Sequence, residues 1–365
     1  MTLYFYFARK FLWAFLALTG VFAAILLLFD LVEHLRRFDT STVGYVAIFE
    51  LMLLNMPKEL YQIIPLIMIL SSLVLFLNLA RSSELVVTRA SGRSALISLL
   101  SPVTVALFIG LFGVTTLNPI VAATTKRYDD QAAAIRSGGG NVLTFSRDGI
   151  WLRQGGDTGQ TVIFAEGANH DATSLRGAIF VTFGDGTGPV RRIHADTAQL
   201  TDGEWRLTNA KIWPLAMGIN SEAESEVAAE LALPTSLTAE QIRDGFGKPR
   251  TVSVWELPRL INQLEDAGFS ARRHTMWLHM ELAQPIFLIA MVLVSAAFTM
   301  RHTRMGRTGL ASLLATMSGF GLYYVRNFAQ ILGENGQIPI ELAAWTPPIA
   351  SVFLALGLLL HMEDG

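Results

Sequence analysis

The residues that could perform catalysis do not stand at catalytic spacings in this chain. His274 and His279 are five positions apart, whereas a zinc-binding helix needs the His-Glu-x-x-His spacing that puts both imidazoles on one face. Ser318-Gly319 lacks the glycine two residues before the serine that an intramembrane serine protease would carry. Together with Gly321, this pair indicates close helix packing or flexibility. The sequence therefore predicts neither a metalloprotease nor an intramembrane serine protease.

The glycine-rich segments do not form a phosphate loop. The Gly-x-x-x-x-Gly-Lys-Ser/Thr motif, whose backbone amides cradle phosphates, occurs nowhere in the sequence. Gly245-Phe246-Gly247-Lys248 lacks the first glycine and the hydroxyl residue, and segment 138–140 is typical of a flexible junction. Cysteine is absent, which excludes disulfides, a thiol nucleophile and Cys-ligated metals. We therefore expect that the chain does not itself hydrolyse ATP.

Six apolar stretches without Asp, Glu, Lys or Arg organise the chain, three before and three after a long polar insert. Each is long enough for a membrane-spanning helix, which needs roughly 18 or more residues. In hydrocarbon the backbone must satisfy its own N–H and C=O groups, so we expect all six stretches to be helical. They lie between Lys10 and Asp30, Glu59 and Arg81, Arg93 and Lys126, Glu281 and Arg301, Arg307 and Arg326, and Glu341 and Glu363.

Lys and Arg residues collect at alternate connections, a bias that marks the cytoplasmic side. The loop from Asn327 to Trp345 contains neither residue type. Because the number of spans is even, both termini are predicted to be cytoplasmic and the polar insert to lie outside. No small-residue cleavage pattern follows Asp30, so the first stretch is expected to remain a membrane helix. The cytoplasmic cations are Arg9, Lys10, Arg81, Arg89, Arg93, Arg301, Arg304 and Arg307.

The polar insert has the pattern of β-structure. Short alternating or β-branched runs recur at close spacing, separated by Gly- and Asp-rich clusters such as Gly155-Gly156-Asp157. This pattern is typical of antiparallel sandwiches, jelly rolls and open barrels. Without disulfides, the insert must fold by core packing alone. The runs are 149–153, 161–165, 178–183, 190–195, 204–207 and 210–213.

Four parts follow from these patterns. Residues 1–125 hold the first three spans, 126–250 the outer β-domain, 251–275 an amphipathic helix with its linker, and 276–365 the last three spans. Apolar residues in segment 254–267 follow helical spacing, and this helix either lies on the outer membrane face or packs against the β-domain. A hydrophobic content of 52% fits a mixture of apolar helices and an ordinary polar domain.

The loop between the second and third spans, residues 81–93, carries a more specific signal. Its pattern predicts a short cytoplasmic helix that ends at a glycine. Apolar side chains would anchor it in a groove of a soluble partner, and charged ones would set the register. The alternative is a capped turn with ordinary interfacial arginines. The anchors are Leu85, Val86 and Ala90, and the polar residues are Glu84 and Arg89.

This loop and several other motifs resemble the lipopolysaccharide export permeases, the LptF/LptG family. The resemblance covers nearly the whole chain, and the Ser-Glu-Leu-Val-Val run followed by Ala-Ser-Gly is most similar to the LptG branch. The matching motifs are Pro57-Lys58-Glu59, Pro65, Arg81-Ser82-Ser83-Glu84-Leu85-Val86-Val87, Ala90-Ser91-Gly92, Gly149-Ile150-Trp151-Leu152, Glu204-Trp205-Arg206-Leu207 and Gln284-Pro285.

The resemblance implies six transmembrane helices with an inserted periplasmic all-β, jellyroll-like domain, in the inner membrane of a Gram-negative bacterium. It implies one permease half of an ABC transporter, paired with an LptF-like half and a dimeric LptB-like ATPase that holds ATP and Mg. Lipopolysaccharide would leave the outer leaflet and pass to the β-domains of LptC and LptA, for which an exposed sheet edge is suited. The chain itself is expected to hold no cofactor or metal and to bind membrane lipid but no nucleic acid.

The resemblance also implies roles for single residues. The loop becomes a coupling helix that contacts the ATPase through Ser83, Glu84, Leu85, Val86, Arg89, Ala90, Ser91 and Gly92. Side chains of the first and fifth spans would take the acyl chains, or else face lipid or pack in the bundle: Phe22, Leu26, Phe29, Phe320, Tyr323, Tyr324 and Phe328. Outer-side cations would bind phosphate, or else snorkel at the interface: His34, Arg36, Arg37, Lys58 and Arg326.

Asp30 departs from the family pattern, in which a basic residue often lies near the outer end of the first span. An acid there would repel a phosphorylated head unless it is paired, and His34 at i+4 is one partner. A lipid with a different head charge, or pairing across the LptF-like half, are the other interpretations.

Other functions stay open at this point. The chain could be the LptF-like half of the same complex, or half of another ATP-coupled exporter that handles lipoproteins or a peptide. It could also be a membrane-anchored scaffold or receptor whose β-domain binds a partner.

Overall fold

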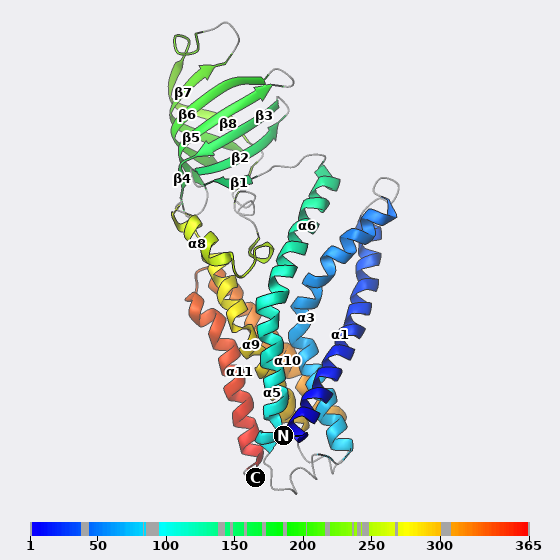
Figure 1. Cartoon of the computed structure of the whole chain (residues 1–365). Helices are drawn as coiled ribbons and strands as arrows, with labels where there is room; N and C mark the ends of the chain where they lie inside the picture. Colours follow the sequence, from blue (N-terminus) through cyan, green and yellow to red (C-terminus); the bar gives the residue numbers. More distant parts are fainter. Residues whose placement is uncertain are drawn as a thin grey trace. The chain divides into compact units, whose positions relative to one another are not determined.

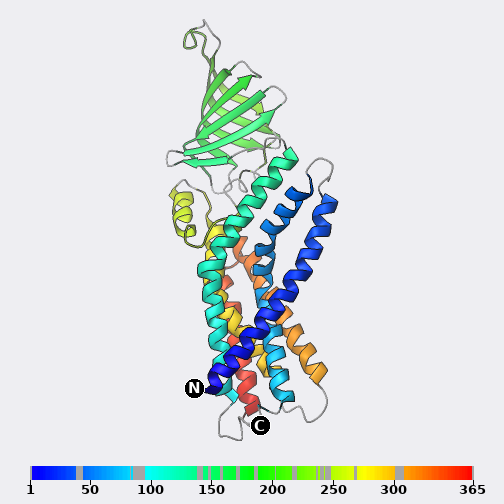
Figure 2. The same ribbon diagram turned by 45° about the vertical axis from the view of Figure 1, so that its right-hand side comes forward.

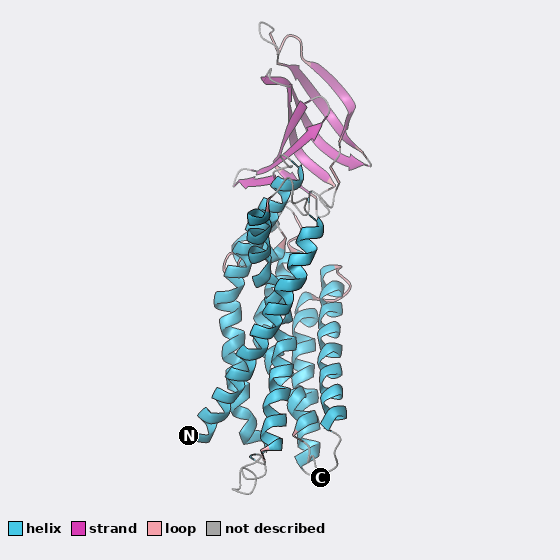
Figure 3. Ribbon diagram, turned by 90° about the vertical axis from the view of Figure 1, so that its right-hand side faces the viewer, coloured by secondary structure: helices cyan, strands magenta, loops and turns pink. Residues whose placement is uncertain are grey.

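The computed structural model divides the chain into two compact units, one helical and one built on a β-sheet (Figure 3). The helical unit comprises Met1–Ala132, Ser253–Trp255 and Thr275–Gly365, and the β unit comprises Ala133–Val252 and Glu256–His274. The structure describes residues 2–37, 44–82, 84, 95–137, 143–146, 149–156, 159–169, 173–184, 188–201, 203–215, 220–235, 237–238, 242, 248–266, 269–300 and 308–363.

Long helices fill the helical unit, and both chain termini lie at the same end of it (Figures 1 and 2). Five helical segments in the described part of the chain are long and apolar enough to cross a membrane. The helix at the fifth predicted span, α10, is not among these five, because glycines, hydroxyl residues, two tyrosines and Arg326 interrupt its apolar sequence. The sixth membrane span therefore stays a prediction. The predicted class, a membrane helical protein with an inserted all-β domain, is confirmed. The helices are α1 (Thr2–Arg37), α3 (Tyr45–Arg81), α5 (Ala95–Phe112), α6 (Asn118–Ser137), α9 (Arg272–Thr299), α10 (Thr308–Glu334) and α11 (Ile340–Glu363).

The third span is a continuous helix with a π-helical turn inside it. The turn, η1 (Gly113–Leu117), joins α5 to α6, and the backbone N–H of Asn118 donates to the carbonyl of Gly113 with the five-residue spacing of a π-helix. A π turn disturbs the regular ladder of backbone hydrogen bonds, and in a membrane helix the displaced groups need other partners.

The helices pack closely around α3, which contacts α1 and α10, while α1 also contacts α5 and α10 also contacts α11. Two glycines permit close approach between helices. A Cβ atom on Gly110 would lie 2.6 Å from the Cα of Pro285 in α9, and one on Gly319 would collide with Ile69 in α3. The predicted packing role of Gly319 is confirmed, whereas no described atom lies within 4 Å of a Cβ at Gly321. The core around these contacts includes Phe11, Ile67, Phe76 and Phe287.

The β unit holds one antiparallel sheet of eight described strands in the order β1-β2-β3-β5-β6-β7-β8, with β4 paired to β5. Apart from the short β4, strands that follow one another in the chain are neighbours, so the sheet is a meander. Gln154 in β2 donates to the carbonyl of Pro234 at 3.3 Å and accepts from Thr235 at 2.6 Å, so the sheet curls until β2 approaches the end of β8. The strands are β1 (Leu143–Ser146), β2 (Gly149–Gly156), β3 (Gly159–Ala165), β4 (Gly167–Ala168), β5 (Ser174–Gly184), β6 (Gly188–Thr201), β7 (Glu204–Pro214) and β8 (Glu226–Pro234).

The curled sheet buries one of its faces. Side chains alternate along each strand, and the buried set fills the inside. The rings of Phe180 and Trp205 meet edge to face there at 6.1 Å between centroids. Other buried residues of this face are Leu152, Ile163, Leu175, Ile193 and Leu207.

Strand β7 joins two runs that the sequence separates. Asn209 lies between them with φ of 52°, a left-handed conformation that asparagine tolerates, and its side chain donates to Asp196 at 3.0 Å. The expectation of two strands over 204–207 and 210–213 was therefore wrong. Strands β1, β4 and β8 were not predicted. The alanines of β8 explain why that strand was missed, because alanine favours helix in isolation.

A short helix, α8 (Leu257–Asp266), occupies the predicted amphipathic segment and buries Leu257, Ile261 and Leu264 along one face. It begins later than predicted, because Val254 lies in a turn before the helix. The helix belongs to the β unit, and a 3₁₀ turn, η2 (Pro249–Thr251), precedes it.

Candidate coupling and substrate sites

Glu84, just beyond the end of α3, is held by the first helix. Lys10 donates to its two carboxylate oxygens at 2.8 and 3.0 Å, and Ser82 donates at 2.9 Å. The hydroxyl of Tyr6 completes the cluster at 3.4 Å. Burial raises the pKa of Glu84, but the hydrogen bonds from Lys10 and Ser82 outweigh it and hold the pKa below its usual value. An ionised carboxylate is thus fixed where α1 and α3 meet.

The structure describes Arg81, Ser82 and Glu84 of the predicted coupling loop. The other residues predicted to contact an ATPase lie outside the described residues: Ser83, Leu85, Val86, Arg89, Ala90, Ser91 and Gly92.

Toward the other end of α1, Asp30 and His34 lie in a buried polar cluster with α3 and α6. His34 Nδ1 is 3.1 Å from Asp30 Oδ1, and its Nε2 is 3.2 Å from the hydroxyl of Tyr128. Asn55 donates to Asp30 at 3.1 Å and to Glu59 at 2.8 Å. The contact of Asp30 with His34, one of the three interpretations of this acid, is present in the structure. Because its ring faces these groups, His34 belongs to an internal network rather than to the surface.

The remaining predicted cations of this region are more accessible. Arg36 and Arg37 are exposed, and Lys58 is half-buried. Arg37 lies 3.5 Å from Glu33 one helical turn earlier, and both side chains are about half exposed. A loose surface pair of this kind holds its partners weakly. These cations are therefore available to an anionic ligand.

Aromatic residues predicted to contact acyl chains lie on the outside of the helical unit. Phe29 on α1 and Tyr324 and Phe328 on α10 expose 71%, 67% and 63% of their surface. Phe320 is less exposed, while Phe22 and Tyr323 are half-buried and pack against the core. Exposed apolar rings of this size need lipid or another protein to cover them.

Arg326 is buried among α3, α9 and α10. Its Nη2 donates to the carbonyl of Met280 at 3.2 Å, its Cζ lies 4.8 Å from the ring centroid of Phe287, and it interacts electrostatically with Glu281. The hydroxyl of Tyr61 donates to Glu281 at 2.5 Å. Opposite charges buried near each other among membrane helices mark a site with a structural or transport role.

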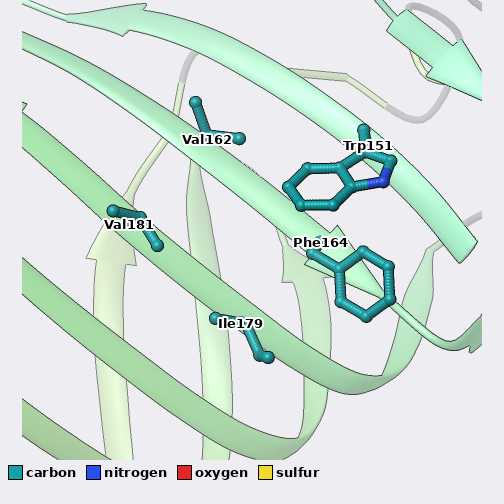
Figure 4. A pocket seen from close by; sticks show the side chains of 5 residues that line it. All are labelled: Trp151, Val162, Phe164, Ile179 and Val181. Carbon is teal, nitrogen blue, oxygen red and sulfur yellow. The ribbon is translucent and has the colours of Figure 1, made fainter.

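A shallow apolar pocket of ≈ 290 Å³ lies on the outer face of the sheet (Figure 4). Cross-strand pairing brings Trp151 beside Phe164 and then Ile179, and Val162 beside Val181. Arg192 and His194 follow on the next strand, opposite Val181 and Ile179. An exposed apolar patch with basic neighbours is a surface able to bind a partner.

Sequence reasoning missed several of these residues. Lys10 was seen as a topology signal rather than as the partner of Glu84. Glu281 served only as the boundary of an apolar stretch, whereas Arg326 was predicted as an outer-side cation and is buried instead. Their charges at the ends of two spans could have indicated that they interact. Tyr61 and Asn118 carried no signal, because single polar residues in apolar helices are common.

The helices that can span a membrane, the charged residues buried among them and the inserted antiparallel domain define a multi-pass membrane protein of permease type. The chain belongs to the family of lipopolysaccharide export system permeases LptF/LptG, whose model matches residues 5–361. It is 23% identical to the lipopolysaccharide export system permease protein LptG of Haemophilus influenzae, over 95% of this chain and 96% of the relative. It is also 23% identical to the protein of the same name from Escherichia coli K12, over 88% of this chain and 86% of the relative.

Proposed function

We propose that the chain is the LptG-type permease half of an ATP-driven exporter. It extracts lipopolysaccharide from the outer leaflet of the inner membrane and passes it to a periplasmic bridge of β-domains. The family match and the relatives named LptG support this proposal. An LptF-like permease, an LptB-like ATPase dimer that binds ATP and Mg, and LptC and LptA complete the assembly.

The topology proposed places both termini in the cytoplasm and the β unit in the periplasm. The Lys and Arg bias of the short loops supports it, and so does the position of both termini at one end of the helical unit (Figure 2). Arg36, Arg37 and Lys58 would then be near the outer surface, where they bind lipid phosphates. The exposed rings of α1 and α10 face acyl chains or the second permease.

The observation that carries the coupling mechanism is the Lys10–Glu84 pair. Glu84 lies close to the end of α3, and Lys10 lies in α1, so a displacement of the coupling loop is transmitted to both of these spans. ATP-driven closure of the ATPase dimer moves the loop, and the spans attached to it narrow a cavity that opens to the outer leaflet.

Glu84→Ala tests this proposal in the complete complex. We expect weaker association with the ATPase, or ATP hydrolysis without lipid export, while membrane insertion is unchanged. The measurements are the ATPase yield in affinity purification, the ATP turnover and the release of lipopolysaccharide from proteoliposomes.

Glu50→Ala is the matched control, because Glu50 is an exposed glutamate of α3 that accepts a hydrogen bond from Gln131 at 2.9 Å. Normal complex yield and normal transport in the Glu84→Ala protein would contradict the coupling role.

A further inference from the structure

Three residues of the connection between the β-sheet and α8 belong to the helical unit. Ser253–Trp255 is grouped with the spans, although the residues on both of its sides belong to the β unit. The backbone N–H of Val254 donates to Asn118 Oδ1 at 2.8 Å, and the indole N–H of Trp255 donates to the carbonyl of Thr115 at 3.2 Å. The connection is therefore anchored on the third span.

Both anchoring points lie at the π turn of that span. Thr115 is inside η1, and Asn118 is the first residue after it. The carbonyls of a π turn do not all accept the regular i→i+4 hydrogen bonds of an α-helix. In a membrane helix, a donor from another segment can provide the missing hydrogen bond. The indole of Trp255 supplies such a donor, so the connection and the π turn stabilise each other.

Asn118 also reaches into the middle of the helical unit. Tyr61 of α3 lies against the π turn, since a Cβ atom on Gly113 would be 3.8 Å from its ring, and its hydroxyl interacts with the Asn118 side chain. The same hydroxyl donates to Glu281 of α9, and Arg326 of α10 donates to the carbonyl of the neighbouring Met280. The network thus runs from the connection through the third span to α3, α9 and α10. Its members are nearly inaccessible, with exposures of 3% for Asn118, 7% for Tyr61, 4% for Glu281 and 8% for Arg326.

We propose that Asn118 and Trp255 are positioning residues that transmit rearrangement of α3, α9 and α10 to the connection that enters α8. The inference rests on the proposed export function and adds the route by which movement of the spans reaches the β unit. A shift of Tyr61 or Glu281 displaces the side chain of Asn118, and Val254 follows through its backbone hydrogen bond. Because residues on both sides of Ser253–Trp255 belong to the β unit, displacing this segment changes where the chain enters that unit.

Trp255→Phe is the decisive variant, because it removes the indole N–H and keeps an aromatic ring at a surface position. Trp13→Phe is its matched control, since both tryptophans are 66% exposed and Trp13 lies outside the network. In the complete complex in proteoliposomes, we expect Trp255→Phe to lower the lipopolysaccharide released per ATP by about three- to tenfold, the range for loss of one hydrogen bond. ATP turnover and complex yield should equal those of the control.

Asn118→Ala should lower the same ratio further, and adding Trp255→Phe to it should have little extra effect, because residues of one network are not additive. A structural role alone would instead reduce complex yield and ATP turnover together. An unchanged ratio in Trp255→Phe, or equal losses in Trp255→Phe and Trp13→Phe, would overturn the inference. If the Asn118→Ala protein fails to assemble, the export ratio of Trp255→Phe still tests the inference, because Trp255 is exposed and its substitution should not prevent folding.

A second readout separates this inference from the export proposal. The chain has no cysteine, so a spin label on Glu256→Cys reports a single exposed site next to the connection. We expect ATP to change the label spectrum in the wild-type background and to change it clearly less with Trp255→Phe. If the wild-type complex hydrolyses ATP but releases no lipopolysaccharide, the export proposal fails, while the label still tests the transmission. A label that responds equally to ATP in both backgrounds would contradict the transmission through Asn118 and Trp255.

Discussion

The helical unit and the β unit distribute their side chains in opposite ways. In the β unit the buried face is apolar, and charged residues such as Arg206 and Glu222 lie outside. In the helical unit several buried positions are polar or charged, whereas large apolar rings are exposed. The buried polar residues include Asp30, His34, Asn55, Asn118, Glu281 and Arg326, and the exposed rings include Trp13, Phe29, Phe108, Phe328 and Phe353.

This difference shows that the two units fold against different solvents. A polar group in hydrocarbon has no water to bind, so the free-energy cost of burying it depends on whether another group inside the protein pairs with it. An apolar group in the β unit gains from leaving water, so its contribution depends on the area it buries. Mutations should therefore act through pairing in one unit and through burial in the other.

The largest expected effect comes from breaking the buried pair of the helical unit. Glu281→Leu removes the buried carboxylate whose charge acts on buried Arg326 and should destabilise the protein by about 3–5 kcal/mol, the cost of an uncompensated buried charge. Adding Arg326→Met should recover most of that loss, because the pair is replaced by apolar groups. Thermal unfolding of the purified protein in detergent measures both. A double variant as unstable as Glu281→Leu would show that the two charges do not act as a pair.

The next effect separates the two faces of the sheet. Ile193→Ala removes a fully buried side chain of the inner face and should cost about 2–5 kcal/mol. Ile179→Ala, on the half-exposed outer face, should cost clearly less, since it leaves a smaller void. Unfolding of the full-length protein followed by near-ultraviolet circular dichroism compares them. Equal losses would mean that the outer face is also buried in the folded protein.

A smaller effect concerns helix packing. Gly110→Ala places a methyl group against the backbone of Pro285 and should destabilise the helical unit by about 1–3 kcal/mol, because the backbone has little room to move. Gly321→Ala meets open space and should be neutral or stabilising by up to about 1 kcal/mol. The shift in unfolding temperature of each variant provides the comparison. A stable Gly110→Ala protein would contradict the close contact between α5 and α9.

The smallest effect on stability is expected at the surface pair. Lys10→Met should change the unfolding free energy by no more than about 1 kcal/mol, because Lys10 and Glu84 remain 36% and 30% exposed. The pKa of Glu84 in the folded protein is lowered from its ordinary value of 4.5. The pair therefore contributes its full stability at pH values above 4.5, and this stability is lost as the pH falls through the lowered pKa. Stability differences between wild type and Lys10→Met should then be constant from neutral to weakly acidic pH. A difference that grows across this interval would contradict the lowered pKa.

Much of the architecture follows from one-dimensional patterns. Apolar length identifies the spans, because the membrane demands a continuous helix, and turn clusters identify most of the strands. The pairing of Asp30 with His34 was predictable from helical spacing. The continuity of β7 was not predicted, because asparagine is typical of turns, whereas Asn209 keeps the strand continuous in a left-handed conformation.

The networks were less predictable because they join residues far apart in the chain. Tyr61 and Glu281 are 220 positions apart, and Lys10 and Glu84 are 74 apart. Such pairs depend on which helices become neighbours, and apolar helices of similar length give little information about that. The basic residues assigned to phosphate show the same limit, since spacing did not distinguish buried Arg326 from exposed Arg36.

The most direct test of the account is to identify what binds the chain. The full-length protein, tagged at its C-terminus, is extracted in mild detergent, and co-purifying molecules are identified by mass spectrometry. We expect an ATPase, a second six-span permease and bound lipopolysaccharide together. Recovery of the chain alone, or with partners that include neither an ATPase nor lipopolysaccharide, would contradict the exporter and favour a membrane-anchored scaffold or receptor.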